Sequence, residues 1–201
     1  MAEALITGAL VDLARAKQYL QRPKDGGAVN TENDEMITQG INYVTGQIRA
    51  YCGRTQLISG TVTNQLHNGS GTNELRTREY PVVSVSAITE VLEDGAATTR
   101  ALTISPIILK AERTIVLPLD TFTKGFQNIR ITYVAGYGSN SADQKALQGA
   151  TLRLLQVWWQ DYEHAIGRGV AFGVGGQSAN LIETAIPKDI ERALSPYRRI
   201  Y

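Results

Sequence analysis

The chain has 201 residues and a mass of 21.9 kDa, a length that suits one domain or one domain with a sub-domain. Its 20 Lys and Arg against 19 Asp and Glu leave a formal charge of +1, which excludes a strongly basic nucleic-acid coat protein and an acidic solvating tail. Hydrophobic residues at 43% and charged residues at 19% lie close to globular averages. That composition excludes intrinsic disorder and a disulfide scaffold, so the chain is expected to fold.

The sequence predicts a protein made in the cytoplasm and not associated with a membrane. Cys52 is the one cysteine and has no partner for an internal disulfide. Glu3 stands in the opening region where a signal peptide would carry positive charge. Charged or polar residues interrupt every apolar region before it reaches the eighteen or so residues that a membrane span needs.

Two helices are predicted at the start of the chain. Residues 9–21 read as a short amphipathic helix that stops before Pro23. Its expected apolar face is Leu10, Leu13, Ala14, Lys17 and Leu20. A second helix is expected to begin after Thr31 as the N-cap and to end at Gly53. Its apolar stripe of Ile37, Ile41, Val44, Ile48 and Tyr51 is expected to pack against another helix.

Strands replace helices between about residues 57 and 137, where β-branched runs alternate with Gly, Asn and Asp. The expected strands are residues 61–66, 74–77, 82–91, 101–109, 114–117 and 128–134. Asn68-Gly69 is read as the tight turn of a hairpin between the first two strands, with His67 as a solvated turn residue. The prediction is an antiparallel unit of about five or six strands inserted between helices.

The third helix is expected to run from Ser141 as its cap to about Ile166. Its expected apolar side is Leu147, Ala150, Leu154, Val157 and Trp158. The glycine-rich stretch after it reads as a mobile loop, and a short helix is expected to open at Pro187 and to end at Ser195-Pro196.

The predicted fold class is therefore α+β: a helical bundle of about three helices plus a short C-terminal helix, with an inserted antiparallel β unit. The expected segments are 1–56 (N-terminal helices), 57–138 (β sub-domain), 139–167 (long helix), 168–186 (glycine-rich loop) and 187–201 (short helix and tail).

No catalytic, cofactor or metal site is expected. Cys52, His67 and His164 lie far apart in the sequence, which is not the spacing of a zinc site. The glycine run at residues 173–176 follows a helix and contains no lysine, so it matches neither nucleotide-binding fingerprint. No Ser lies in a Gly-x-Ser-x-Gly setting. The sequence indicates a protein that is not an enzyme and takes no cofactor.

Two clusters are candidate interfaces. Adjacent tryptophans lie on different faces of a helix, so Trp159, with Tyr162, is predicted to face another subunit or a tail protein. The alternative is that both Trp158 and Trp159 are core residues of a helix packed on two sides. The apolar residues of the glycine-rich loop, Val170, Phe172 and Val174, are expected to become ordered against the same kind of neighbour.

The C-terminal tail is the second cluster, with two aromatic residues and two arginines among its last five residues. These residues are Tyr197, Arg198, Arg199, Ile200 and Tyr201. Tyr and Arg concentrate binding energy in few contacts, so the tail is predicted to anchor the subunit to another protein. The alternative is a frayed, solvated end.

Five motifs in this order resemble those of the head-tail connector, or adaptor, proteins of tailed bacteriophages. They are the helix at residues 10–20, Ile48-x-x-Tyr51-Cys52-Gly53-Arg54, Tyr80-Pro81-Val82-Val83-Ser84-Val85, Ile131-x-Tyr133-x-Ala135-Gly136-Tyr137, and Leu194-x-Pro196-Tyr197-Arg198-Arg199. The similarity covers nearly the whole chain.

The resemblance implies a structural protein that forms a ring, commonly twelve-fold, below the portal at the capsid vertex. It implies the portal and a tail, stopper or neck protein as partners, with double-stranded DNA passing through the lumen without sequence-specific binding. It also implies a place in the virion neck. The near-neutral charge is compatible, because a strongly basic lumen would hold DNA that must slide through.

A nucleic-acid or ligand-binding module that uses the β insertion is the alternative function. Its exposed face would need basic and aromatic residues together. The basic candidates are Arg76, Arg78, Arg113 and Arg130.

Overall fold

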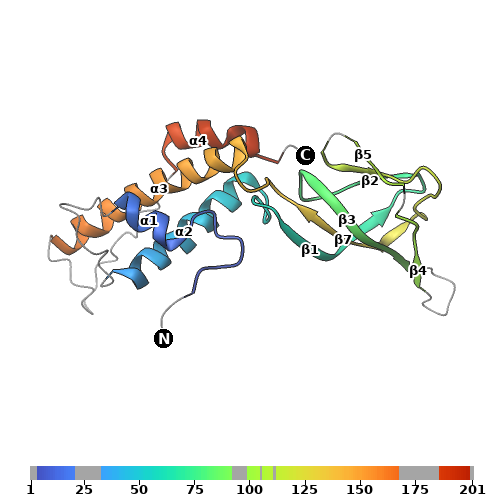
Figure 1. Ribbon diagram of the computed structural model, residues 1–201, viewed down its shortest axis with the longest axis horizontal. Helices are drawn as coiled ribbons and strands as arrows, with labels where there is room; N and C mark the ends of the chain where they lie inside the picture. Colours follow the sequence, from blue (N-terminus) through green and yellow to red (C-terminus); the bar gives the residue numbers. More distant parts are fainter. Residues whose placement is uncertain are drawn as a thin grey trace. The chain divides into compact units, whose positions relative to one another are not determined.

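The computed structural model describes residues 4–20, 33–91, 99–104, 106–110, 112–167 and 186–199. The chain divides into two compact units. The helical unit comprises Met1–Gly53 and Ala142–Tyr201, and the β unit comprises Arg54–Ser141. Along the chain, helices precede and follow an inserted set of antiparallel strands, so the predicted α+β class is confirmed (Figure 1).

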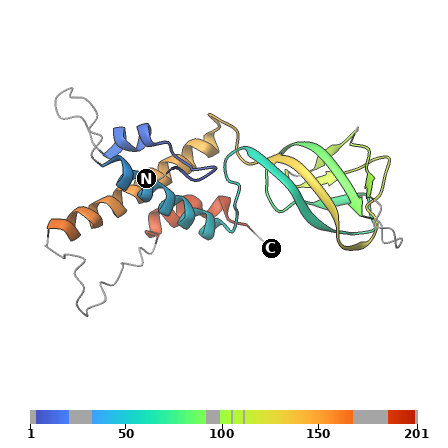
Figure 2. The same cartoon turned by 90° about the horizontal axis from the view of Figure 1, so that it is seen from below.

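The helical unit contains α1 (Leu13–Leu20), α2 (Asp34–Cys52), α3 (Ala142–Gly167), α4 (Lys188–Leu194) and the short 3-10 turn η1 (Ser195–Tyr197). In both views α2 and α3 lie side by side, α1 contacts both of them, and α4 packs along α3 (Figures 1 and 2).

Helix α2 has the predicted apolar stripe and the predicted end. Its residues Ile37, Ile41, Val44 and Ile48 are fully buried. Gly53 has a left-handed φ of 64° and donates its N–H to the carbonyl oxygen of Ala50, which closes the last turn. The helix begins at Asp34 with Asn33 at the N-cap position, whereas the predicted cap, Thr31, lies outside the described residues.

The first helix differs from its prediction at the start and on its buried face. It begins at Leu13, because the Asp12 carboxylate accepts the Arg15 backbone N–H at 2.7 Å and so caps the first turn. Ala14, expected on the apolar face, is exposed, whereas Ala16 is buried. Lys17 is buried as well and forms an ion pair with Asp34 at the start of α2.

The β unit contains seven described strands in two sheets, more than the five or six predicted. The four-stranded sheet has the order β1 (Gly60–Gly69), β7 (Gly125–Ala135), β3 (Val82–Val91), β4 (Thr99–Ala101). The three-stranded sheet has the order β2 (Glu74–Arg76), β6 (Thr114–Val116), β5 (Ile108–Lys110). The predicted strand 101–109 is wrong, because its two ends belong to β4 and β5 in different sheets.

The predicted hairpin around Asn68-Gly69 is also wrong. β1 pairs with β7 along its length, and β2 pairs with β6. Gly69 lies inside β1 opposite Gly125, and a Cβ there would lie 1.7 Å from the Thr123 carbonyl oxygen. The glycine therefore allows a close backbone approach in a strand, not a turn. His67 is buried next to it and contacts Gln65 Oε1 at 2.8 Å, so it is not a solvated turn residue.

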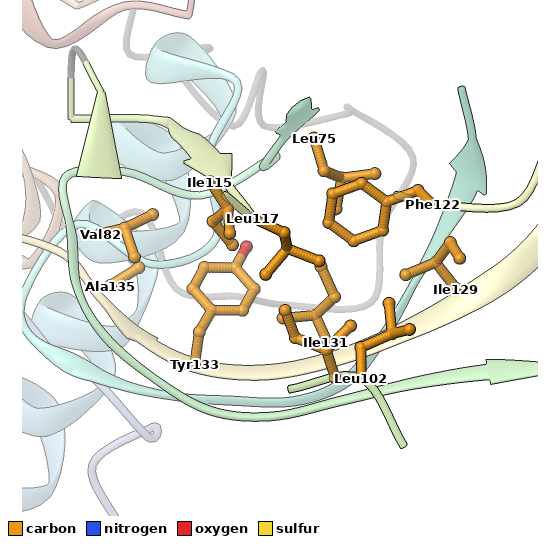
Figure 3. Packing of buried hydrophobic residues seen from close by; sticks show 11 residues of the cluster. Leu75, Val82, Leu102, Ile115, Leu117, Phe122, Ile129, Ile131, Tyr133 and Ala135 are labelled. Atoms are coloured by element: carbon orange, nitrogen blue, oxygen red, sulfur yellow. The ribbon is translucent and has the colours of Figure 1, made fainter. Parts of the chain in front are cut away.

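The core of the β unit lies between the two sheets (Figure 3). Its buried residues are Leu75, Val82, Ile88, Leu102, Ile115, Leu117, Phe122, Ile129, Ile131, Tyr133 and Ala135. Tyr133 brings a hydroxyl into this core, where it accepts the Glu79 backbone N–H at 3.2 Å and donates to Gln65 Oε1 at 2.7 Å. The hydroxyl is thus fully paired, as a buried polar group requires.

Helix α3 has the predicted bounds and a wider buried surface than predicted. Besides the predicted Leu147 and Leu154, the structure buries Thr151, Leu152 and Leu155. The hydroxyl of Thr151 donates to the Leu147 carbonyl oxygen at 2.7 Å, which explains how a polar residue is buried in mid-helix.

Candidate functional site

The predicted docking tail begins inside the helical unit. Tyr197 closes η1 and is only 7% exposed, and its hydroxyl donates to Asp143 Oδ1 on α3 at 3.1 Å. Pro196, expected to end the short helix, lies within η1. Tyr197 is therefore a core residue of its own subunit, because its ring is covered and its hydroxyl is paired. Docking on another protein stays a prediction for the residues after it.

The next two residues lie against the C-terminal end of α2. Arg198 is exposed, and its guanidinium carbon lies 5.7 Å from the centre of the Tyr51 ring. Arg199 donates its backbone N–H to the Cys52 carbonyl oxygen at 2.8 Å. The remaining predicted tail residues, Ile200 and Tyr201, lie outside the described part of the chain.

Three aromatic rings meet near the C-terminal end of α3. Trp158 and Tyr162 are stacked with centroids 5.8 Å apart and planes within 7°, and Trp159 lies 5.6 Å from Tyr162. Trp159 is 9% exposed, whereas Trp158 and Tyr162 are half-buried. The Trp158 ring fills the space above Gly40 of α2. The predicted order of burial is therefore wrong, because Trp159, expected to face outward, is more buried than Trp158. Both tryptophans contribute to packing inside the helical unit, as the alternative had it, and an interface role for Trp159 and Tyr162 stays a prediction.

The predicted loop contacts Val170, Phe172 and Val174 lie outside the described residues. The side chain of His164 lies outside them too.

The β unit contains a buried polar cluster that the sequence analysis missed. Arg54 is 2% exposed, and its guanidinium lies 3.8 Å from the centre of the Tyr80 ring and 5.5 Å from that of Tyr137. The buried Glu79 carboxylate accepts the backbone N–H groups of Thr55 and Gln56 at 3.3 and 3.1 Å, and the Thr55 hydroxyl at 2.9 Å. The sequence signal for this cluster was Arg54, a charged residue directly after Gly53, the glycine that ends α2.

The four arginines of the alternative function do not share a surface. Arg76 and Arg113 line a shallow hollow of about 460 Å³ with Thr72, Glu74 and Thr114 on the three-stranded sheet. Arg113 lies against the Tyr80 ring at 5.2 Å. Arg130 lies on the four-stranded sheet between Leu66 and Thr89. The structure therefore separates Arg130 from the others, and Glu74 adds negative charge to the hollow.

Exposed apolar side chains gather in the β unit. Six of the nine exposed large hydrophobic residues of the described chain belong to it: Leu66, Val83, Ile108, Leu109, Leu119 and Phe126. Leu119 and Phe126 are the most exposed, at 77% and 75%. Such residues are candidates for contact with other proteins.

The described residues contain no group of three His, Cys, Asp or Glu placed to hold a metal ion. Within the same residues, no helix is long and apolar enough to cross a membrane. The Arg153 side chain on α3 holds the pKa of the exposed Asp189 carboxyl below its usual value.

Comparison with known proteins decides the family. The family model of the head completion protein matches residues 18–200. The chain belongs to the head completion protein family. This head completion protein is a structural protein of a phage-like virion that acts where head and tail are connected, as the resemblance implied.

Solved structures share the fold. Similar chains occur in the neck of an empty gene transfer agent particle computed with C6 symmetry (TM-score 0.58), in the virion of a native particle (0.57) and in the neck of a native particle computed with C12 symmetry (0.54). Each of these chains is 14% identical in sequence to the present chain, and each match covers 100% of the present chain and 95% of the other. No curated protein matches the chain.

Proposed function

We propose that this head completion protein is a non-enzymatic connector that forms a closed ring between the portal and the tail, with twelve copies in the ring and the DNA channel continuing through it. The observation that carries this proposal is family membership over residues 18–200 together with a fold shared by chains in necks computed with six-fold and twelve-fold symmetry. Cyclic assembly uses one face of each subunit against a different face of the next.

The two units would supply different contacts in such a ring. The helical unit carries the tail and the aromatic cluster, and the β unit carries most of the exposed apolar side chains. We propose that Trp159, Tyr162, Val170, Phe172 and Val174 take part in contacts with a neighbouring copy or a tail protein.

Portal docking is proposed for Arg198, Arg199, Ile200 and Tyr201, with Tyr197 holding the tail to its own subunit. Many tails on one ring would bind together, because each later contact is intramolecular once the first has formed. A formal charge of +1 suits a channel, since the chain would not retain DNA through counterion release.

Truncation of the tail tests this function. The cut belongs after Arg199, because removal of Tyr197 would also remove a buried side chain and its bond to Asp143. A chain that lacks residues 200–201 is expected to fold normally and to lose attachment to purified portal, as seen by electron microscopy. Attachment of the Arg198→Ala chain to portal, measured at several salt concentrations, distinguishes a protein contact of Arg198 from its attraction to DNA phosphate. Normal ring docking by the truncated chain would contradict the proposed tail.

The alternative is a nucleic-acid module on the β unit, and it is less favoured because two of its arginines, Arg76 and Arg130, lie on different sheets. Binding of the isolated chain to double-stranded DNA at physiological salt would support it, and binding to portal without DNA would support the connector.

A further inference from the structure

The last residues that the structure describes close the C-terminal end of α2. A helix leaves its last four carbonyl groups without partners inside the helix. Gly53 donates to two of them, that of Ala50 at 3.1 Å and that of Arg49. Arg199, almost 150 positions later in the chain, donates to another, that of Cys52, at 2.8 Å. The cap of α2 is therefore built from two distant parts of the chain.

Residues 197–199, here called the C-terminal latch, are held at three consecutive positions. The Tyr197 hydroxyl binds Asp143, the Arg198 guanidinium lies against the Tyr51 ring, and the Arg199 N–H binds Cys52. The backbone at Arg198 is extended, with φ −69° and ψ 136°. The hydroxyl of Tyr51 in turn donates to the Glu191 carbonyl oxygen of α4 at 3.2 Å, so the ring under Arg198 is itself fixed.

We infer that the C-terminal latch holds Arg198 and Arg199 in position for docking, and that portal docking and the last turn of α2 stabilise each other. This inference rests on the proposed docking of the tail. A docking segment that is already ordered loses less conformational entropy when it binds, which raises its affinity. Because coupling between two events is reciprocal, a portal that binds Arg198 and Arg199 in the conformation held by the latch must also strengthen the cap of α2. Arg199 is thus a positioning residue that acts through its backbone.

Two substitutions at one position separate the backbone contribution from the side-chain contribution. Arg199→Pro removes the N–H that binds Cys52, and Arg198 already has the extended conformation that a residue before proline adopts. Arg199→Ala keeps the N–H and removes the guanidinium. Circular dichroism checks that both variants fold.

Hydrogen exchange at residues 49–53 of the free protein is the first measurement. We expect exchange in Arg199→Pro to be about fivefold faster than in the wild type, because one hydrogen bond of ordinary net strength is lost. Arg199→Ala is expected to exchange at the wild-type rate. Equal exchange in all three proteins would overturn the latch.

Docking to purified portal is the second measurement. Residues 49–53 of the wild type are expected to exchange more slowly when docked. Arg199→Pro is expected to bind at least fivefold more weakly than Arg199→Ala, because both variants lack the guanidinium and only the proline variant also lacks the N–H that binds Cys52. Wild-type docking that leaves residues 49–53 unchanged would overturn the coupling. If the wild type does not bind portal at all, the proposed function and the coupling both fail, and the free-protein comparison still decides whether Arg199 caps α2.

Discussion

Gly40 of α2 leaves the space that the Trp158 ring of α3 occupies. A Cβ at position 40 would lie 2.5 Å from Trp158 Cζ3, closer than real side-chain contacts allow. Gly46, two turns later on the same helix, has no atom within 4 Å of its Cβ position. One glycine of α2 is therefore required by helix packing, and the other is not.

Gly40→Ala and Gly46→Ala are expected to change stability in opposite directions. Alanine favours a helix interior over glycine by about 1 kcal/mol, so Gly46→Ala is expected to stabilise the protein by about that amount. At position 40 the same helix gain applies, but the added methyl group must displace the Trp158 ring, and overpacking of this kind costs about 1–3 kcal/mol, so a net loss of up to about 2 kcal/mol is expected. Urea denaturation measures both changes. A Gly40→Ala protein as stable as Gly46→Ala would contradict the described packing of α2 on α3.

Substitution of Glu79 in the β unit is expected to destabilise the protein. Its buried carboxylate accepts three hydrogen bonds from Thr55 and Gln56, and Glu79→Gln leaves part of this set unpaired. We expect a loss of about 1–3 kcal/mol in the free energy of unfolding. The matched control is Glu74→Gln, which affects an exposed pair with Lys110 at 3.4 Å and is expected to change stability by less than about 1 kcal/mol. Equal losses in the two variants would contradict this account of Glu79.

Asp189 is expected to titrate below the usual range of an aspartate. The Arg153 guanidinium binds its carboxylate and stabilises the charged form, which lowers the pKa of Asp189. A pKa that is lower in the folded state stabilises the fold above the unfolded pKa, and this contribution disappears as the pH falls through the folded pKa. Carbon-detected NMR titration is expected to show the low pKa in the wild type and a return toward the usual value in Arg153→Ala. An unchanged pKa of Asp189 in that variant would show that the pair is absent in solution.

Tyr197→Phe is expected to lower stability without loss of docking. The substitution removes the hydroxyl that binds Asp143 and keeps the buried ring, so a loss of about 1 kcal/mol is expected in thermal or urea unfolding. Binding to portal should be nearly unchanged, because the hydroxyl faces its own subunit. A variant of wild-type stability that no longer docks would instead assign Tyr197 to the portal interface.

The helices could be predicted where local signals act alone. The 4-3 spacing of the α2 stripe and the glycine at its end are properties of one continuous segment, and both were confirmed. The α1 prediction was wrong at its start because the cap at Asp12 competes with an apolar pattern that begins earlier. Leu10 belongs to that pattern and is buried ahead of the helix, as is its neighbour Val11.

The strand pairing could not be predicted, because pairing is decided by residues far apart in sequence. Asn68-Gly69 carries a strong local turn signal, yet the Asn68 side chain accepts the Gln127 N–H at 2.9 Å and Gly69 accommodates Thr123. The burial of Tyr197 was missed for a similar reason, since its partner Asp143 is 54 residues away. A position near the chain terminus suggests exposure only when no such partner exists.

The central claim is that this head completion protein forms a ring at the junction of head and tail, and cryo-electron microscopy of the virion neck tests it most directly. The account predicts a closed ring of this chain between portal and tail, with density for residues 200–201 against the portal. A neck reconstruction in which portal and tail proteins meet with no copy of this chain between them would contradict it.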